Sequence, residues 1–193
     1  MAPRESPKLF VFLGNTGANY ARTRHNAGWM LLDREPFSGA ANWQQKFKAV
    51  WARITISGSS VLLLKPQTMM NLSGESVQAA MRYFRHAPDE VLVAHDDVEL
   101  AFGQVGIRFG GGLAGHNGLR SIANSLSARD FWRLRIGVGR PGRGDLHSYV
   151  LGRFFPEEEI VLPGILDEAA ALLQTGLRSG FVEVPPGNIP ERQ

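Results

Sequence analysis

The chain has 193 residues, of which 44% are hydrophobic, and a formal net charge of +3. This composition excludes a disordered chain and predicts a globular protein of one domain, or at most two. The absence of cysteine excludes disulfides, thiol catalysis and thiolate metal sites. No apolar run reaches the roughly 18 residues that span a bilayer, and residues 1–7 lack the core of a signal peptide. We therefore expect a soluble, cytoplasmic protein without a membrane segment.

Basic residues are concentrated in one part of the chain. Residues 101–153 contain eight arginines against only Asp130 and Asp145, whereas the residues after 153 carry a net charge of −5. Arginine outnumbers lysine 17 to 4, and its planar guanidinium suits phosphate contacts. The pattern favours a polyanionic partner such as a nucleic acid, although arginine-rich usage can also reflect genome composition.

Apolar runs alternate with amphipathic segments along most of the chain. The runs predict strands at residues 8–14, 46–57, 60–65, 91–94, 105–109 and 131–138. Three- and four-residue apolar spacing predicts helices at residues 27–34, 72–86, 117–126 and 157–178. Thr23 or Asn26 would cap the first helix, and Pro163 would break the last or begin its second part. Residues 1–7 and the proline-rich residues 181–193 are expected to be loose termini.

This alternation predicts an α/β fold, in which residues 1–193 form a single domain with helices on both faces of a twisted sheet. The strands at 46–57 and 60–65 form a hairpin through a Gly-Ser turn. The sheet is therefore expected to be mixed but mostly parallel.

Polar side chains gather where the predicted strands end. Residues 15–25 follow the first strand, residues 67–71 follow the hairpin, and residues 95–97 follow the strand at 91–94. A fourth cluster, residues 115–118, lies at the start of a predicted helix. Because the carboxyl ends of strands in an open α/β sheet meet at one edge, we expect these clusters to converge on one site.

The histidine, aspartate and asparagine side chains of these clusters suit hydrolysis of an ester. His25 would act as general base on water, and a carboxylate would orient its imidazole. Asp96 and Asp97 face opposite sides if the strand continues, so the pattern leaves both open. Asparagine amides would bind the developing oxyanion or the substrate. No serine stands in a nucleophile-elbow pattern, which favours direct attack by water without a covalent intermediate.

These residues also have purely structural interpretations. Single asparagines most often occupy turns and helix caps, and His95 and His116 could serve only the fold. The histidines form no H-x-H or H-E-x-x-H pair, so no metal site is expected.

Two glycine-rich stretches, residues 110–115 and 137–142, match the G-x-G-x-x-G pattern of dinucleotide-binding folds. In those folds the motif opens the domain and an acid ends the second strand, whereas here the first stretch lies past the middle of the chain and Asp130 precedes its strand. A nucleotide-dependent enzyme is therefore a weak alternative.

Five stretches of the chain are similar to the bacterial-type peptidyl-tRNA hydrolase family. They read LGNTGANYARTRHNAGWMLLD (13–33), KPQTMMNLSGESV (65–77), VAHDDVELAFGQVGIRFGGGLAGHNGLRSI (93–122), FWRLRIGVGRPG (131–142) and YVLGRFFPEE (149–158). The resemblance implies a hydrolase that cleaves the ester between a peptide and the 3′ end of tRNA, works as a monomer and needs no metal or cofactor.

The resemblance also implies roles for single residues. His25 matches the catalytic base, Asp96 its orienting partner, and Asn117 a residue that positions the water or the substrate. The other matched positions are the substrate-binding residues Asn15, Tyr20, Met70 and Asn71, and the tRNA-binding arginines Arg108 and Arg133.

Two departures from the family pattern lie near these positions. Thr16 replaces the usual proline, which makes the turn after Asn15 less rigid, and Leu113-Ala114 replaces the usual His-Gly. The alternative to the enzyme is a non-catalytic RNA-binding relative of the same fold. Such a relative need not keep the base, and this chain keeps every proposed catalytic residue.

Overall fold

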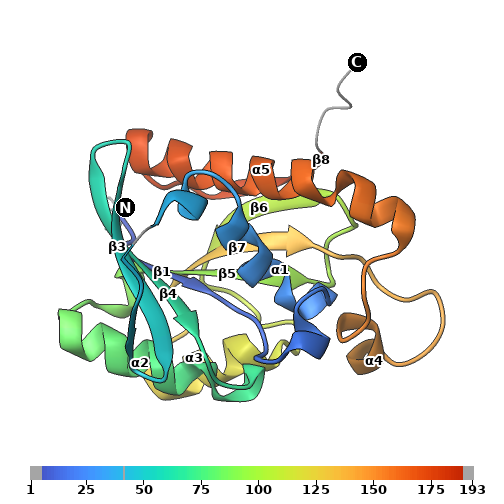
Figure 1. Cartoon of the computed structure of the whole chain (residues 1–193), viewed down its shortest axis with the longest axis horizontal. Coiled ribbons are helices and arrows are strands. Elements are labelled where there is room, and N and C mark those ends of the chain that lie inside the picture. The colour runs from blue at the N-terminus through green and yellow to red at the C-terminus, as the bar shows by residue number, and fades with distance from the viewer. Residues whose placement is uncertain (1–5, 41, 189–193) are drawn as a thin grey trace.

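The computed structural model describes residues 6–40 and 42–188. Eight strands of this part form one sheet in the order β2-β3-β4-β1-β5-β7-β6-β8 (Figure 1). The strands are β1 (Leu9–Phe12), β2 (Gln44–Lys46), β3 (Ala49–Ile56), β4 (Ser59–Pro66), β5 (Val91–Asp97), β6 (Gln104–Phe109), β7 (Trp132–Gly137) and β8 (Val184–Asn188). The α-helices are α1 (Ala27–Met30), α2 (Ser73–Phe84), α3 (Asn117–Leu126), α4 (Leu146–Val150) and α5 (Pro156–Ser179).

The four central strands, β4-β1-β5-β7, run parallel, and the strands outside them pair antiparallel. The mixed sheet is confirmed, but parallel pairing predominates only in its centre. Residues 9–13 and 91–94 are buried, because helices cover both faces of the sheet at this point. This double burial explains why both segments are continuous apolar runs.

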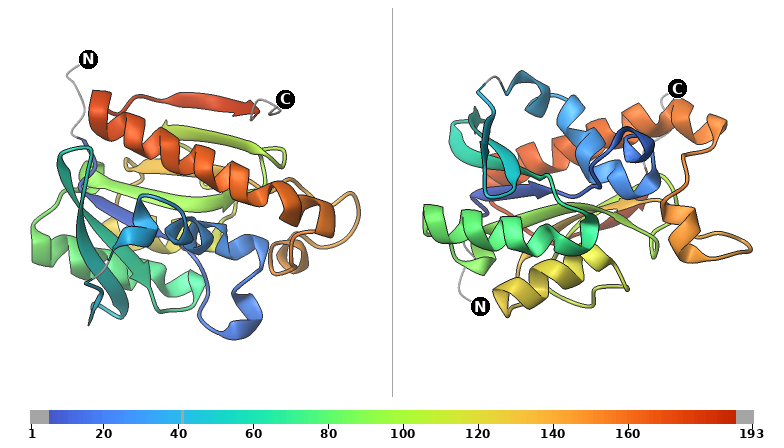
Figure 2. Two further views of the ribbon diagram at one scale, coloured as in Figure 1. Left: turned by 45° about the horizontal axis from the view of Figure 1, so that its top comes forward. Right: turned by 60° about the horizontal axis from the view of Figure 1, so that its bottom comes forward.

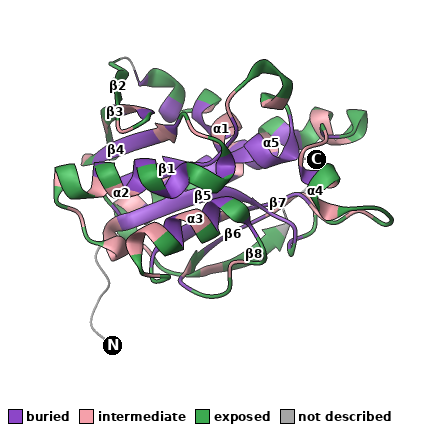
Figure 3. Cartoon of the chain, turned by 90° about the horizontal axis from the view of Figure 1, so that it is seen from below, coloured by how far each residue is buried: buried purple, intermediate pink, exposed green. Residues whose placement is uncertain are grey.

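Helices flank both faces of the sheet, as predicted. Helix α5 crosses one face, and α2 and α3 lie side by side against the other (Figure 1, Figure 2). The core on the α5 face includes Phe10 and Leu166, and the core on the opposite face includes Val77 and Leu119. Seen from below, the buried strands run between helices whose outer surfaces are exposed (Figure 3).

Helix α5 is a core helix, although its length and composition alone would also suit a membrane span. Its residues Leu162, Ile165 and Leu173 are buried in the core beside the sheet. It continues without interruption through Pro163, where the sequence predicts a break or the start of a second part. A proline removes only one backbone donor, and the buried side chains on both sides of it hold the helix against the sheet.

The C-terminal segment is more ordered than its prolines predict. Residues 181–193 are expected to be loose, yet Val184–Asn188 pair with β6 as an antiparallel edge strand, where proline is tolerated. Phe181 packs against the rings of Phe10 and Trp132 and so anchors the strand. The rest of the two predicted loose termini, residues 1–5 and 189–193, lies outside the described residues.

Two strand boundaries also differ from the prediction. Phe47 and Lys48 have positive φ angles and form a turn that divides the predicted strand 46–57 into β2 and β3. Strand β5 continues past residue 94, because Asp97 still pairs with Gly137 on β7. The polar residues 95–97 therefore belong to a buried strand instead of a loop.

Candidate active site

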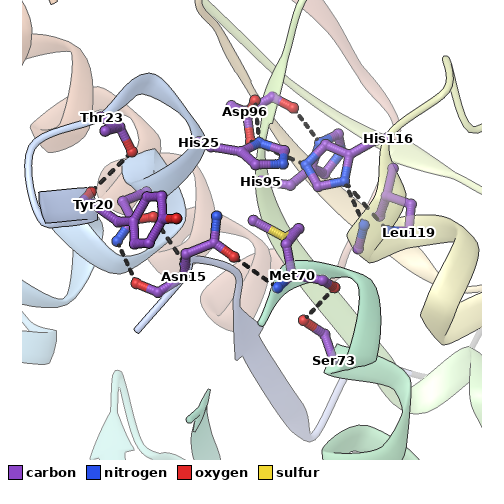
Figure 4. A network of polar contacts seen from close by, with 12 residues as sticks. Asn15, Tyr20, Thr23, His25, Met70, Ser73, His95, Asp96, His116 and Leu119 are labelled. Carbon is purple, nitrogen blue, oxygen red and sulfur yellow. Dashed lines mark hydrogen bonds and ion pairs between the residues drawn. The ribbon is translucent and has the colours of Figure 1, made fainter. Parts of the chain in front are cut away.

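His25 lies on η2 (Arg24–Asn26), a 3-10 turn after β1 that contacts β5. Its Nδ1 is 2.9 Å from Oδ1 and 3.0 Å from Oδ2 of Asp96 (Figure 4). A carboxylate only accepts hydrogen bonds, so Nδ1 carries the proton and the lone pair of neutral His25 is on Nε2. This is the tautomer that a general base requires.

A second histidine contacts the same carboxylate. Nε2 of His116 lies 3.0 Å from Oδ1 of Asp96, and its Nδ1 accepts the N–H groups of Gly118 and Leu119 at the start of α3. Because Nδ1 accepts, His116 is neutral and donates its Nε2–H to Asp96. The buried side chains of His25, Asp96 and His116 thus connect η2, β5 and α3 (Figure 4).

The contacts of Asp96 and His25 shift the pKa values of both side chains. Burial raises the pKa of Asp96, but the charge of His25 and the hydrogen bonds from both histidines outweigh burial and hold this pKa well below its usual range. Burial lowers the pKa of His25, but the charge and hydrogen bond of Asp96 outweigh it, so this pKa lies above its ordinary value. The site therefore combines a charged carboxylate with an imidazole that accepts a proton readily.

Asp97 serves a different network from Asp96. Its Oδ2 is 2.7 Å from Nε of Arg135, and its Oδ1 accepts the N–H of Glu99 at 2.8 Å. His95 donates from Nδ1 to the carbonyl of Asp96 at 2.7 Å, and burial lowers the pKa of His95 to about 3, so it stays neutral. In the structure Asp96 therefore contacts His25, and Asp97 pairs with Arg135. The sequence pattern left the choice between the two aspartates open.

Asn15 is held by three hydrogen bonds. Its N–H donates to Oδ1 of Asn26 at 2.9 Å, its carbonyl accepts from Nδ2 of Asn26 at 3.0 Å, and its Oδ1 accepts the N–H of Met70 at 2.7 Å. These bonds fix the turn although Thr16 replaces the family's proline. Neither Thr23 nor Asn26 caps a helix with its side chain, because Asn26 is committed to Asn15.

Two cavities open beside His25. The Asn15 cavity, of about 260 Å³, contains every predicted substrate-binding residue, namely Asn15, Tyr20, Met70 and Asn71. The Arg133 cavity, of about 190 Å³, extends along residues 113–115 of the glycine-rich stretch 110–115 and past His95 to Arg133. His25, Asn117 and His147 line both cavities.

The two predicted tRNA-binding arginines lie in different environments. Arg108 is exposed on β6. Arg133 is only 2% exposed, and its Nη1 donates to the carbonyl of Gly112 at 2.7 Å. Burial, with the charges of Arg108 and Arg135, lowers the pKa of Arg133 to about 10. Arg133 therefore holds residue 112 of the glycine-rich stretch 110–115 and lines a cavity instead of standing on the surface, and its contact with tRNA stays a prediction.

Sequence reasoning missed several residues around the site. Arg24, beside the predicted base, is buried and pairs with Glu158 on α5, and no local pattern reveals that partner. The sequence pattern offers Asn26 only as a helix cap, and it leaves His116 open between a member of the predicted site and a structural residue. No sequence pattern marks His147, because α4 is too short for a periodic signal.

Among the described residues, His25, Asp96 and His116 also present ligand atoms within 4.8 Å of one another, a spacing that a metal ion could use. The carboxylate of Asp96 is already engaged by hydrogen bonds from both histidines, which a metal ion bound to that carboxylate would have to replace.

A buried histidine–aspartate pair at the carboxyl edge of an α/β sheet, flanked by two cavities, is the arrangement of a hydrolase that activates water. The sequence profile of the family described as Peptidyl-tRNA hydrolase matches residues 9–186. The peptidyl-tRNA hydrolase of Geotalea daltonii is 46% identical over 175 residues, which cover 90% of this chain and 92% of that protein. That of Desulfitobacterium hafniense is 41% identical, with 90% and 94% covered.

A solved structure agrees with these relatives. The crystal structure of peptidyl-tRNA hydrolase from Acinetobacter baumannii superimposes with a TM-score of 0.84 at 35% identity and covers 93% of this chain and 92% of that one. The chain belongs to the peptidyl-tRNA hydrolase family. Its activity is that of a carboxylic ester hydrolase acting on peptidyl-tRNA.

Proposed function

We propose that His25 removes a proton from the water that attacks the ester carbonyl of peptidyl-tRNA, and that Asp96 orients the imidazole. The observation that carries this proposal is the contact of Nδ1 of His25 with both oxygens of Asp96, since it leaves Nε2 to accept the proton. The water oxygen bonds to the carbonyl carbon as its proton passes to Nε2. The intermediate then releases the ribose 3′ oxygen, which takes that proton.

The two cavities suggest how the substrate is divided. We place the peptide in the Asn15 cavity, where Tyr20 and Met70 provide apolar surface and asparagines offer amide groups. The terminal nucleotide of tRNA then occupies the Arg133 cavity. With this division the ester lies beside His25 and Asn117, which line both cavities.

Asparagine side chains supply the hydrogen bonds that the reaction needs. Asn71 and Asn117 are exposed at the cavities, so their amide N–H groups are available to the water or to the developing oxyanion. One such donor typically contributes about 10²–10³-fold to the rate. Asn15 is buried and its oxygen already accepts the N–H of Met70, which leaves its amide N–H groups to bind the peptide.

Arg108 is the predicted phosphate contact that remains on the surface. It shares the basic part of the chain with the exposed residues Arg120, Arg129 and Arg143. We infer that these exposed arginines bind the tRNA backbone, and that the enzyme acts as a monomer in the cytoplasm. A non-catalytic RNA-binding relative would use the same arginines but would leave the ester intact.

The test is the release of N-acetyl-amino acid from N-acetyl-aminoacyl-tRNA by the wild type and by His25→Ala. We expect His25→Ala to lose hydrolysis while tRNA binding persists. His86→Ala is the matched control, because His86 lies after α2 and lines neither cavity. Hydrolysis by His25→Ala would show that His25 is not the general base. Failure of the wild type to hydrolyse the substrate would favour the RNA-binding alternative.

A further inference from the structure

His147 lies where the two cavities meet. Three side chains line both cavities, and the proposed hydrolysis uses only His25 and Asn117. The third, His147, lies on α4. All five histidines belong to the described residues, and His147 is the one that is exposed.

The backbone of α4 is fixed relative to His25. The Tyr149 hydroxyl donates to the carbonyl of Val138 at 2.8 Å, and Asp145 caps the helix by accepting the N–H of Ser148 at 2.8 Å. The guanidinium of Arg24, the residue before His25, lies 4.2 Å from the centre of the Tyr149 ring. Helix α4 and η2 therefore form one packed unit, and His147 has a defined place in it.

The imidazole of His147 is available to a ligand. No hydrogen bond within the described part of the chain uses its ring nitrogens, and its charged neighbour is Asp145, which is committed to the cap of α4. A neutral imidazole offers one donor and one acceptor on opposite sides of its ring. It therefore suits a hydroxyl group, which also donates and accepts.

We propose that His147 binds the 2′-hydroxyl of the terminal ribose beside the scissile ester and makes the enzyme selective for a ribonucleotide 3′ end. This inference rests on the proposed division of the substrate between the two cavities. The ester is on the 3′ oxygen, so the neighbouring 2′-hydroxyl also lies at the boundary that His147 lines. The 2′-hydroxyl is the group that distinguishes RNA from DNA, and it both donates and accepts hydrogen bonds.

The experiment combines a change in the enzyme with a change in the substrate. N-acetyl-aminoacyl-tRNA is prepared with a terminal adenosine or a terminal 2′-deoxyadenosine, with the acyl group on the 3′ oxygen in both. We expect His147→Ala to lower kcat/KM about tenfold on the ribose substrate, the loss of one hydrogen bond. On the 2′-deoxy substrate His147→Ala and the wild type should have the same kcat/KM, because the partner of His147 is already absent.

Two further variants sharpen the comparison. His147→Gln keeps a donor and an acceptor and should recover most of the activity on the ribose substrate, which a simple loss of packing would not allow. His86→Ala should leave both substrates unaffected. Thermal unfolding of each variant verifies that the fold is intact, as expected for an exposed side chain on a capped helix.

The possible results separate this inference from the proposed hydrolysis. If His147→Ala lowers kcat/KM equally on both substrates, or on neither, His147 does not bind the 2′-hydroxyl, while the role of His25 is untouched. If instead His25→Ala still hydrolyses the ribose substrate, the proposed base is wrong, and the comparison of the two substrates with His147→Ala still stands by itself.

Discussion

Nη2 of Arg24 lies 2.6 Å from Oε2 of Glu158, a residue 134 positions later in the sequence. Arg24 is 2% exposed, and its Nη1 also donates to the carbonyl of Arg153. The same Glu158 carboxylate accepts the N–H of Phe155 at the start of α5. The pair therefore connects the turn that carries His25 to the longest helix of the protein.

Because this ion pair is buried, removing one partner leaves an unpaired charge. We expect Arg24→Ala to lower the free energy of unfolding by about 3–5 kcal/mol, measured by urea denaturation. Arg22→Ala is the control: Arg22 and Glu159 lie 3.6 Å apart, and Arg22 is 64% exposed. An exposed pair contributes about 0–1 kcal/mol. If both variants lost the same free energy of unfolding, burial would not make the Arg24–Glu158 pair more important for stability than an exposed pair.

The orienting role of Asp96 predicts a large effect from a nearly isosteric change. Asp96→Asn keeps the size of the side chain but replaces one of the two oxygens that contact Nδ1 of His25 with a donor NH2 group and removes the negative charge, so the imidazole turns or changes tautomer. We expect kcat to fall about 10²–10⁴-fold, with a smaller change in the dissociation constant for tRNA. Single-turnover hydrolysis and a binding assay measure the two effects separately.

Asp97→Asn provides the matched comparison, because Asp97 is the adjacent residue of the same strand. Its carboxylate pairs with Arg135 on the other face of the sheet. We expect Asp97→Asn to reduce stability while kcat stays within about tenfold of the wild type. If the larger loss of kcat were found in Asp97→Asn, the orienting role would pass to Asp97.

The raised pKa of His25 predicts the pH dependence of the enzyme. Burial lowers this pKa, but Asp96 outweighs burial, and the net value lies above the ordinary value of about 6.5. A general base must be neutral, so kcat/KM should fall in acid with a midpoint above about 6.5. In Asp96→Asn the charge that raises the pKa of His25 is gone and only the lowering by burial remains, so the midpoint of the residual activity should move to lower pH. An unchanged midpoint would mean that another group controls the profile.

The same shift affects stability. A pKa that is higher in the folded state means that the protonated form of His25 favours folding. Its contribution is fully present below the unfolded pKa of about 6.5 and is lost as the pH rises through the folded pKa. Unfolding measured on both sides of this window should therefore show that His25→Gln loses more stability on the acid side.

The centre of the fold can be predicted from the sequence because burial on both faces leaves continuous apolar runs, as in β1. The base can be predicted because His25 and its asparagines follow such a run. The limits of β5 cannot be predicted this way, since residues 95–97 are polar and are buried only because β7 and the two histidines supply partners. For the same reason the local sequence does not reveal that Arg133 is buried.

Gly28 offers a test of how closely the turn that carries His25 must approach β5. A Cβ atom at this position would lie 2.5 Å from the carbonyl oxygen of Ala94 and 2.6 Å from that of Leu13. Both are backbone atoms of the central sheet, which have little freedom to move. Gly28→Ala should therefore push α1 and the adjacent η2 away from β5 and lengthen the contact between His25 and Asp96.

We expect Gly28→Ala to lose about 1–3 kcal/mol of stability from overpacking, together with a clear loss of kcat. Gly164→Ala is its counterpart: Gly164 is inside α5, and no atom lies within 4 Å of a Cβ built there. Alanine at that position should stabilise the helix by roughly 0.5–1 kcal/mol and leave kcat unchanged. Urea denaturation and hydrolysis of N-acetyl-aminoacyl-tRNA measure both variants. Full activity in Gly28→Ala would mean that the distance between His25 and Asp96 tolerates this displacement, which would weaken the case for a precisely oriented base.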